Sequence, residues 1–323
     1  MKSKSDLVAY CDDLNEFGWF IELDHRLEGI RFEKIERRGR NPLIVDELVK
    51  YDRPDIILLV NGIPKLVIEK TSEVPTGHNV GQRMARLVRS VELGVPTIYF
   101  APFRGRKHGS YTSICDLNAR LLLAFESMWR IHGVPILAVN WPCDENGSLI
   151  TDDSAEAELK ELVKRYIDSD FKLSKNMFAS KRQSQIEEYN RRIEVFKNYA
   201  LPPDTVTFSS TDIIFKDNKN RKLVGEMSKA KTRRESVVYE IGMSVAGCKR
   251  QDPYTGMQFI YDYLYCREGV EIDHKHRNLI LSFPKLTYSV WINNNPNDSN
   301  TKSSNWYLTA DLMLFSDAIV ACR

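Results

Sequence analysis

The chain has 323 residues, with 46 Lys and Arg against 44 Asp and Glu, so its formal net charge is +2. Hydrophobic residues make up 42% and charged residues 28%, proportions that are typical of folded globular proteins and exclude a disordered chain. The near-neutral total also excludes a uniformly basic DNA coat, although local basic patches remain open. At roughly 100–200 residues per domain, the length predicts two domains or one large one.

Apolar runs and cysteines predict where the protein resides. The longest apolar runs, such as 56–60, are the size of a strand and far shorter than the ~18 residues of a membrane span. The N-terminal segment has no apolar core of the signal-peptide type. Six cysteines are spread along the chain without a CxxC pair, a pattern expected of reduced thiols. We therefore expect a cytoplasmic protein with no membrane partner.

The first 150 residues alternate strand and helix signals. Residues 5–17 are predicted to form a short amphipathic helix and residues 43–49 a helical turn. Two β-rich runs then flank Asn61-Gly62, the strongest short-range signal for a hairpin, which predicts a hairpin over 55–69. The alternation predicts an α/β layer structure, completed by helices over 78–93 and 113–131 and strands over 97–100 and 135–139.

Three regions follow from the change in pattern along the chain. A first α/β domain is predicted over 1–150. The next segment, 151–200, is charge-rich and helix-periodic, and 154–199 contains no Gly or Pro, so we expect one or two long helices that act as a connector. Strand-like sequence resumes after Pro202-Pro203 and predicts a second α/β half over 201–323.

An internal echo links the two halves. A shift of 157 residues aligns 55–69 with 212–226, and eight of fifteen positions are identical without a gap. A shared vocabulary of apolar β-residues explains the apolar matches. It does not explain why Asp212 and Glu226 fall at the positions of Asp55 and Glu69. We therefore favour a structural duplication, which predicts a second hairpin and makes the second half a candidate pseudo-repeat of the first.

The two acidic residues of the first hairpin suggest a metal site. Asp55 begins the first strand and Glu69 ends the returning one, so the antiparallel turn brings them side by side. Converging carboxylates are costly unless a cation neutralises them, and Mg²⁺ favours one or two carboxylates with waters and phosphate oxygens. Such an ion supports phosphodiester hydrolysis. A pair of surface carboxylates flanking an ordinary hairpin is the alternative, and the matched second copy favours the metal site.

This pattern resembles the signature of the PD-(D/E)XK nucleases, whose best-known members are type II restriction endonucleases. Arg53-Pro54-Asp55 is followed by thirteen residues and then by Glu69 within an apolar strand. The resemblance covers about residues 45–105. It implies a mixed central sheet flanked by helices, with Asp55 and Glu69 as the Mg²⁺ ligands.

The family pattern also places a Lys two residues after the Glu, where this chain has Thr71. Lys70 is adjacent to Glu69 but points to the opposite face of a regular strand, unless a bulge re-aims it. Lys70 is the leading candidate for the base that assists the attacking water. Lys65 or a residue of the next helix is the alternative.

The second copy offers Asp212, Glu226 and Lys229 as a second candidate site, with Ser228 at the position of the family Lys. Two interpretations stay open. One chain holds two active sites, one for each DNA strand, or the second copy is a degenerate half kept for binding and architecture. A pseudo-dimeric monomer would mimic the two-fold symmetry of restriction dimers, and a homodimer is the other arrangement.

Basic residues are clustered although the net charge is small. Three clusters, over 37–40, 104–108 and 229–234, are of the kind that contacts phosphates and reads guanine edges. The helix after the hairpin begins near His78, where its free amides can bind a phosphate. Arg86 and Arg89 are equally consistent with a solvated helix face. The residues expected to contact DNA are Arg38, Arg40, His78, Gln82, Arg83, Arg104, Arg106 and Lys107.

The resemblance therefore predicts sequence-specific, Mg²⁺-dependent hydrolysis of double-stranded DNA by a type II restriction endonuclease of a restriction–modification system. A non-catalytic DNA-binding relative of the fold is one alternative, because Thr71 and Ser228 replace the family Lys. A repair nuclease that recognises DNA structure is the other. No GxxxxGK[ST] or GxGxxG motif occurs, so ATP-dependent or dinucleotide chemistry is not expected.

Overall fold

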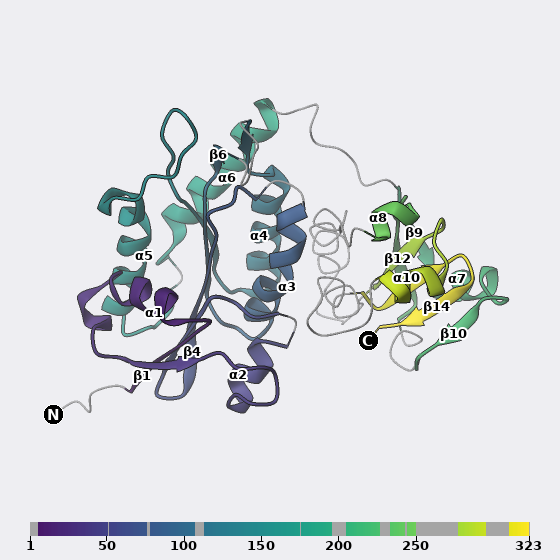
Figure 1. Cartoon of the computed structure of the whole chain (residues 1–323), viewed down its shortest axis with the longest axis horizontal. Coiled ribbons are helices and arrows are strands. Elements are labelled where there is room, and N and C mark those ends of the chain that lie inside the picture. The colour runs from purple at the N-terminus through teal and green to yellow at the C-terminus, as the bar shows by residue number, and fades with distance from the viewer. Residues whose placement is uncertain are drawn as a thin grey trace. The chain divides into compact units, whose positions relative to one another are not determined.

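The computed structural model describes residues 6–50, 52–75, 78–106, 113–174, 176–195, 205–226, 233–242, 244–249, 277–294 and 310–322. The chain divides into two compact units: Met1–Thr76 with Arg86–Val195, and Gly77–Ala85 with Phe196–Arg323. Each unit contains a six-stranded mixed sheet with helices beside it, which confirms the α/β class (Figure 1). Two residues with predicted roles, Lys107 and Lys229, lie outside the described residues.

The sheet of the first unit has the strand order β2-β1-β3-β4-β5-β8. The pairs β2–β1, β4–β5 and β5–β8 are parallel. The pairs β1–β3 and β3–β4 are antiparallel. Strands β3 and β5 are buried along their whole length, so their sequences are continuous apolar runs without alternation. The strands are β1 (Leu7–Cys11), β2 (Arg31–Lys34), β3 (Ile56–Val60), β4 (Ile63–Lys70), β5 (Thr97–Ala101) and β8 (Ile136–Asn140).

Helices cover both faces of this sheet. Figure 1 shows α1 and α5 on one side and α3 and α4 on the other. The small hairpin β6 (Arg104–Arg106) and β7 (Ile114–Asp116) follows β5. The helices are α1 (Leu14–Ile21), α2 (Leu43–Leu48), α3 (His78–Glu92), α4 (Ala119–His132), α5 (Ala157–Asp168) and α6 (Ala179–Val195), with 3-10 turns η1 (His25–Leu27) and η2 (Asp153–Glu156). Of α3, the part from Arg86 onward belongs to this unit.

The N-terminal segment differs from its predicted helix over 5–17. Leu7–Cys11 is the strand β1, and α1 begins only after Asp13, whose carboxylate accepts from the N–H groups of Asn15 and Glu16. This segment forms a strand and not a helix because β2 and β3 pair with it on its two sides. Its side chains also enter two cores, with Ala9 on one face of the sheet and Val8 on the other.

The predicted helical connector over 151–200 instead belongs to the first unit as far as Val195. The apolar stripe of α5, which includes Leu159 and Leu162, packs into the same core as the sheet residues Ile68 and Phe100. Helix α6 lies along the edge strand β8, where the buried Gln185 accepts a hydrogen bond of 2.8 Å from the Ala138 N–H. The periodicity predicted these helices correctly, but it could not say which surface their apolar side covers.

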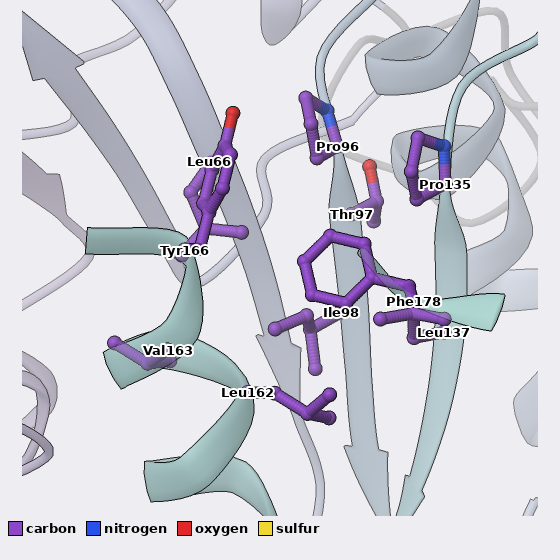
Figure 2. A pocket seen from close by; sticks show the side chains of 10 residues that line it. All are labelled: Leu66, Pro96, Thr97, Ile98, Pro135, Leu137, Leu162, Val163, Tyr166 and Phe178. Atoms are coloured by element: carbon purple, nitrogen blue, oxygen red, sulfur yellow. The ribbon is translucent and has the colours of Figure 1, made fainter. Parts of the chain in front are cut away.

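A small cavity lies in this core between α5 and the strands β4, β5 and β8. Figure 2 shows Leu162 and Tyr166 of α5 facing Leu66 and Ile98 of the sheet. Its volume is about 10 Å³, and a cavity needs roughly 10–15 Å³ to hold one water. Burial raises the pKa of Tyr166 to about 12. The cavity is a packing defect of an apolar core and has no room for a ligand.

The sheet of the second unit has the order β10-β14-β13-β12-β11-β9. Strands β11, β12 and β13 are parallel, while β9 and β14 are antiparallel to their inner neighbours and β10 is parallel to β14. The elements are β9 (Thr205–Ser210), α7 (Thr211–Asp217), β10 (Lys222–Val224), β11 (Glu235–Glu240), α8 (Val245–Lys249), β12 (Asn278–Phe283), α10 (Tyr288–Asn294), β13 (Leu312–Phe315) and β14 (Ala318–Ala321).

Among the described residues, the second unit does not repeat the arrangement of the first. Its pairing pattern differs from that of the first unit when the strands are taken from either edge. The predicted hairpin over 212–226 is wrong, because 211–217 is the helix α7 and β10 pairs with β14. Asp212 lies in the first turn of α7 and Glu226 follows β10, and both side chains are exposed.

None of the described helices combines the length and the apolar character needed to cross a bilayer.

Candidate active site

The β3–β4 hairpin places Asp55 and Glu69 at the same end of two adjacent strands. Asp55 directly precedes β3, and Glu69 is the next-to-last residue of β4. Ile56 pairs with Ile68, so the two acidic residues occupy the next position of the ladder. The backbone N–H of Lys70 donates to Asp55 Oδ2 at 2.6 Å, which ties the Asp55 side chain to the end of β4.

Arg86 of α3 contacts both of these carboxylates. Its Nη1 donates to Oε1 and Oε2 of Glu69 at 3.0 Å each and lies 3.9 Å from Asp55 Oδ1. The opposite side of the guanidinium binds Asp52, whose Oδ2 accepts from Nε at 2.9 Å and from Nη2 at 2.5 Å. We call these four residues, Asp52, Asp55, Glu69 and Arg86, the carboxylate–arginine centre.

The charged groups in the middle of this centre are shielded from solvent. The Glu69 side chain is fully buried, and the Arg86 side chain is 18% exposed. Burial alone would lower the pKa of Arg86, but the charges of Glu69, Asp52 and Asp55 raise it above its ordinary value, so the guanidinium stays protonated. The centre thus gathers three carboxyl groups around one guanidinium.

Lys70 lies on the opposite face of β4 from Glu69. Its Nζ pairs with Glu16 Oε2 of α1 at 3.1 Å and lies 4.2 Å from the centre of the Trp19 ring. The irregularity of the hairpin is between Leu58 and Leu59, near the turn, so no bulge re-aims the Lys70 side chain toward Glu69. The irregularity in the hairpin therefore lies near the turn and not at the end of β4 where Lys70 is.

Thr71, at the position of the family Lys, is part of a turn. Its hydroxyl accepts from the Glu73 N–H at 3.1 Å, and its own N–H donates to the Phe100 carbonyl at 3.0 Å. The side chain is buried, at 5% exposure. Thr71 therefore stabilises the turn that follows β4. It does not take the place of the family Lys, whose ammonium group would face the site.

A groove opens at the same edge of the sheet. Strands β4, β5 and β8 are parallel, so their carboxyl ends meet at the edge where Glu69 lies. The groove has a volume of about 800 Å³ and begins at Phe103, after β5, and at Asn140, which ends β8. The Phe103 N–H donates to Asn140 Oδ1 at 2.8 Å. Ligand sites of open α/β sheets characteristically lie outside the carboxyl ends of the strands.

The wall of this groove is attached to the chain that leaves the carboxylate–arginine centre. Asn118 donates its backbone N–H to the Pro75 carbonyl at 2.9 Å. A Cβ on Gly105 of β6 would lie 3.3 Å from Val74 and 3.0 Å from Cys143 Sγ, so a larger residue there would push these closely packed segments apart by a few tenths of an ångström. The residues after Glu69 thus support the β6–β7 hairpin directly.

Arg192 of α6 binds the two chain ends of the β6–β7 hairpin. It is 2% exposed and donates to the carbonyls of Phe103 at 3.1 Å and Leu117 at 3.2 Å. Its Nε also donates to Glu188 at 2.6 Å. The groove carries equal numbers of both charges, because its ionisable lining is Arg104, Lys181, Arg191 and Arg192 against Asp116, Asp144, Glu145 and Glu188.

The residues predicted to contact DNA have different surroundings. Arg38 and Arg40 are exposed in the loop after β2. This loop starts at the edge of the sheet where Asp55 lies, because β2 is parallel to β1 and β1 is antiparallel to β3. Arg104 and Arg106 are exposed on β6, with Arg106 Nε donating to the Asn146 carbonyl at 2.7 Å. The remaining described ones, His78, Gln82 and Arg83, lie on α3.

Sequence patterns do not reveal two residues of the centre. Nothing in the motif points to Asp52, and the spacing of Arg86 is equally consistent with a solvated helix face. Arg89, to which the same applies, donates to the Glu47 carbonyl at 2.8 Å and pairs with Glu92 at 3.4 Å. The available signal was an acidic residue three positions before Asp55. Its partner across 34 residues is defined only by how α3 packs against the hairpin.

The donors of the centre fit Mg²⁺ in their chemistry, because carboxylate oxygens are the ligands that this ion prefers. Their arrangement in the structure holds a guanidinium, since both oxygens of Glu69 accept from Arg86. Among the described residues, no group of three or more His, Cys, Asp or Glu is placed to hold a metal ion. A metal ion at Glu69 would therefore compete with Arg86 for these oxygens.

No protein-family model matches the chain, and no curated protein and no solved structure is similar to it. The carboxylate–arginine centre and the groove beside it are therefore the features from which a function can be inferred.

Proposed function

We propose that this protein is a metal-dependent nuclease that hydrolyses phosphodiester bonds of double-stranded DNA at specific sequences, as a type II restriction endonuclease does. The observation that carries the proposal is the meeting of Asp55 and Glu69 at one end of the β3–β4 hairpin. The mixed sheet flanked by helices is the architecture that the family resemblance implies, which supports the proposal further.

The surroundings of the two carboxylates suit a phosphodiester substrate. A divalent ion bound by them would activate a water and offset the charge that builds on the phosphate. Exposed arginines reach this edge from two sides, with Arg38 and Arg40 after β2 and Arg104 after β5. Such side chains position DNA through its backbone phosphates.

The roles of the residues around the hairpin end follow from their contacts. Lys70 orients Asp55 through its backbone N–H, while its ammonium group pairs with Glu16. For Lys70 to assist the attacking water, it would have to leave Glu16 and cross to the face of Glu69. We therefore assign Lys70 first to positioning Asp55, and its predicted role as the assisting base depends on that change of partner.

Matched substitutions in the two echoed segments test the proposal. Asp55→Asn should lower Mg²⁺-dependent cleavage of a long DNA by more than about 100-fold, the upper range for loss of a group that supports a metal ligand. Asp212→Asn is the control, because Asp212 is exposed on α7, and its cleavage rate should stay within about twofold of the wild type. Full cleavage by the Asp55→Asn protein would disprove the assignment.

The pattern of products sharpens the same experiment. Discrete fragments from a long DNA support recognition of a sequence. A smear from intact duplex argues against it, and cleavage confined to branched or damaged DNA identifies the repair nuclease that the sequence left as an alternative.

A non-catalytic DNA-binding relative is the second candidate. Two observations favour it: Arg86 occupies both oxygens of Glu69, and Thr71 replaces the family Lys. This candidate predicts that the wild-type protein binds DNA in EDTA and gives no nicking when Mg²⁺ is added. That outcome would contradict the first proposal and support the second.

A further inference from the structure

The two sides of the Arg86 guanidinium hold different carboxylates. Nη1 serves Glu69, which is fully buried, and also approaches Asp55. Nε and Nη2 together serve Asp52, whose side chain is 29% exposed. A buried carboxylate needs a partner of opposite charge, and the cost of leaving it without one is high. Arg86 therefore supplies positive charge at the place where the proposed function puts a metal ion.

We propose that Arg86 is an internal cation that holds this centre closed in the absence of metal, and that it releases Glu69 when a divalent ion binds. The inference rests on the proposed function for the identity of the ligands, Asp55 and Glu69. A guanidinium and a divalent cation repel each other at contact distance, and they compete for the same oxygens. Metal binding at Glu69 should therefore weaken the contact between Arg86 and Glu69.

Asp52 makes this release feasible. The contacts from Nε and Nη2 to Asp52 do not involve Nη1, and the Asp52 side chain is 29% exposed, so Arg86 and Asp52 can shift together and free Glu69 while their own pair is kept. Arg86 then remains paired next to the metal site. The apparent metal affinity of the wild-type protein equals the intrinsic affinity of the open centre reduced by the fraction of molecules that are open.

The test measures the binding of Mg²⁺ alone, without DNA, by titration calorimetry and by the shift in melting temperature. Wild-type protein is compared with Arg86→Gln and with Arg89→Gln. Arg89 is a matched control, since it lies one turn later on α3 and pairs with Glu47 and Glu92.

In EDTA we expect Arg86→Gln to melt about 5–15 °C below the wild type, because the buried Glu69 loses the two hydrogen bonds and the positive charge that Arg86 supplies. Mg²⁺ should restore most of this loss and bind at least about tenfold more tightly than to the wild type, since a positive charge next to the ligands is gone. Arg89→Gln should have the Mg²⁺ affinity of the wild type. Equal Mg²⁺ affinity in Arg86→Gln and wild type would overturn the proposal.

Two further variants keep the test decisive. Arg86→Lys retains the charge but not the fork of N–H groups, so it should fold more readily and bind Mg²⁺ with an affinity between those of wild type and Arg86→Gln. If Arg86→Gln does not fold, wild-type affinity in Arg86→Lys overturns the proposal. Adding Glu69→Gln to either variant should abolish the gain in affinity. A gain that survives this addition places the ion elsewhere and also overturns it.

The DNA-cleavage assay separates this inference from the proposed function. A gain in Mg²⁺ affinity without any wild-type cleavage supports the internal cation and rejects the nuclease. Cleavage by the wild type without a gain in the Arg86 variants supports the nuclease and rejects the internal cation.

Discussion

Segments 55–69 and 212–226 share eight of fifteen residues, including both acidic ones, and form different structures. The first is the β3–β4 hairpin, in which Asp55 and Glu69 are neighbours. The second is the helix α7 followed by β10, which leaves Asp212 and Glu226 exposed on separate elements. The positions that differ decide the structure, and with it whether the acidic pair can act together.

The first decisive position is in the turn. Asn61 and Gly62 have φ angles of 52° and 75°, as a two-residue turn between twisted strands requires. The residue that corresponds to Gly62 is Lys219, and Asn218 before it has a φ of −109° at the end of α7. A lysine strongly disfavours the left-handed conformation that glycine adopts freely.

The second decisive difference is the run that precedes the turn. Leu58, Leu59 and Val60 of β3 are all buried, as a strand covered on both faces requires. Lys216 and Asp217 replace the last two of them in the second segment and are exposed. A helix that buries one side, with Ile214 inward, accommodates these charges, whereas a central strand does not.

The largest effect is expected from exchanging the buried apolar residue for its counterpart. Leu59→Lys places a charge at a position that is 4% exposed and should destabilise the first unit by about 3–5 kcal/mol or more. Lys216→Leu should change the second unit by less than about 0.5 kcal/mol. Hydrogen exchange read separately in β3 and β12 would measure both. Equal protection of β3 in the Leu59→Lys and wild-type proteins would contradict this account.

A smaller effect is expected from exchanging the turn residue. Gly62→Lys should cost about 1–2 kcal/mol in the first unit, because a side chain disfavours its φ of 75°. No heavy atom lies within 4 Å of the added Cβ, so the cost is that of the backbone conformation alone. Urea unfolding followed in the first unit gives the value, and Gly62→Asn, which tolerates positive φ better, should recover part of it. A neutral Gly62→Lys variant would show that the turn does not select the hairpin.

The smallest expected effect is on the pH dependence of stability. It arises at Cys11 of β1, which lies beside β3 and near several acidic side chains. Burial, with the charges of Glu16, Asp13 and Asp55, raises the pKa of the Cys11 thiol from 9.0 to about 12. The unfolded chain loses this proton near pH 9 while the folded protein keeps it, so the stabilisation is fully present below pH 9 and is lost as the pH rises toward 12.

Site-resolved alkylation measures this shift. Native Cys11 should stay unmodified by iodoacetamide at pH 9, whereas the urea-unfolded chain should react there. Asp55→Asn removes one of the charges and should lower the pKa slightly, leaving most of the burial effect. Rapid modification of native Cys11 at pH 9 would show that the thiol is not held in this environment.

Local signals were sufficient for much of the first unit. Asn61-Gly62 predicted the hairpin, and the spacing of apolar residues predicted α3 and the two helices α5 and α6. The same signals were insufficient where pairing partners decide. Residues 7–11 have enough helical periodicity to mislead, and they form a strand because β2 and β3 lie on either side.

The candidate site was predictable to the same extent. Asp55 and Glu69 follow from spacing along one hairpin, which is a local property. The part played by Asp52 and Arg86 depends on the packing of α3 against the hairpin end, which no short window of sequence contains. The side of the strand on which Lys70 lies was predictable from strand geometry, but its pairing with Glu16 was not.

The contact between Gln185 and Ala138 has a consequence for association with other chains. An edge strand normally offers its N–H groups to any strand that approaches, and this is a common route to aggregation. On β8, the Ala138 N–H is bound by a buried side chain of α6, which lies where another strand would have to pair. A second copy that paired its sheet through β8 would therefore have to displace α6 and break this hydrogen bond.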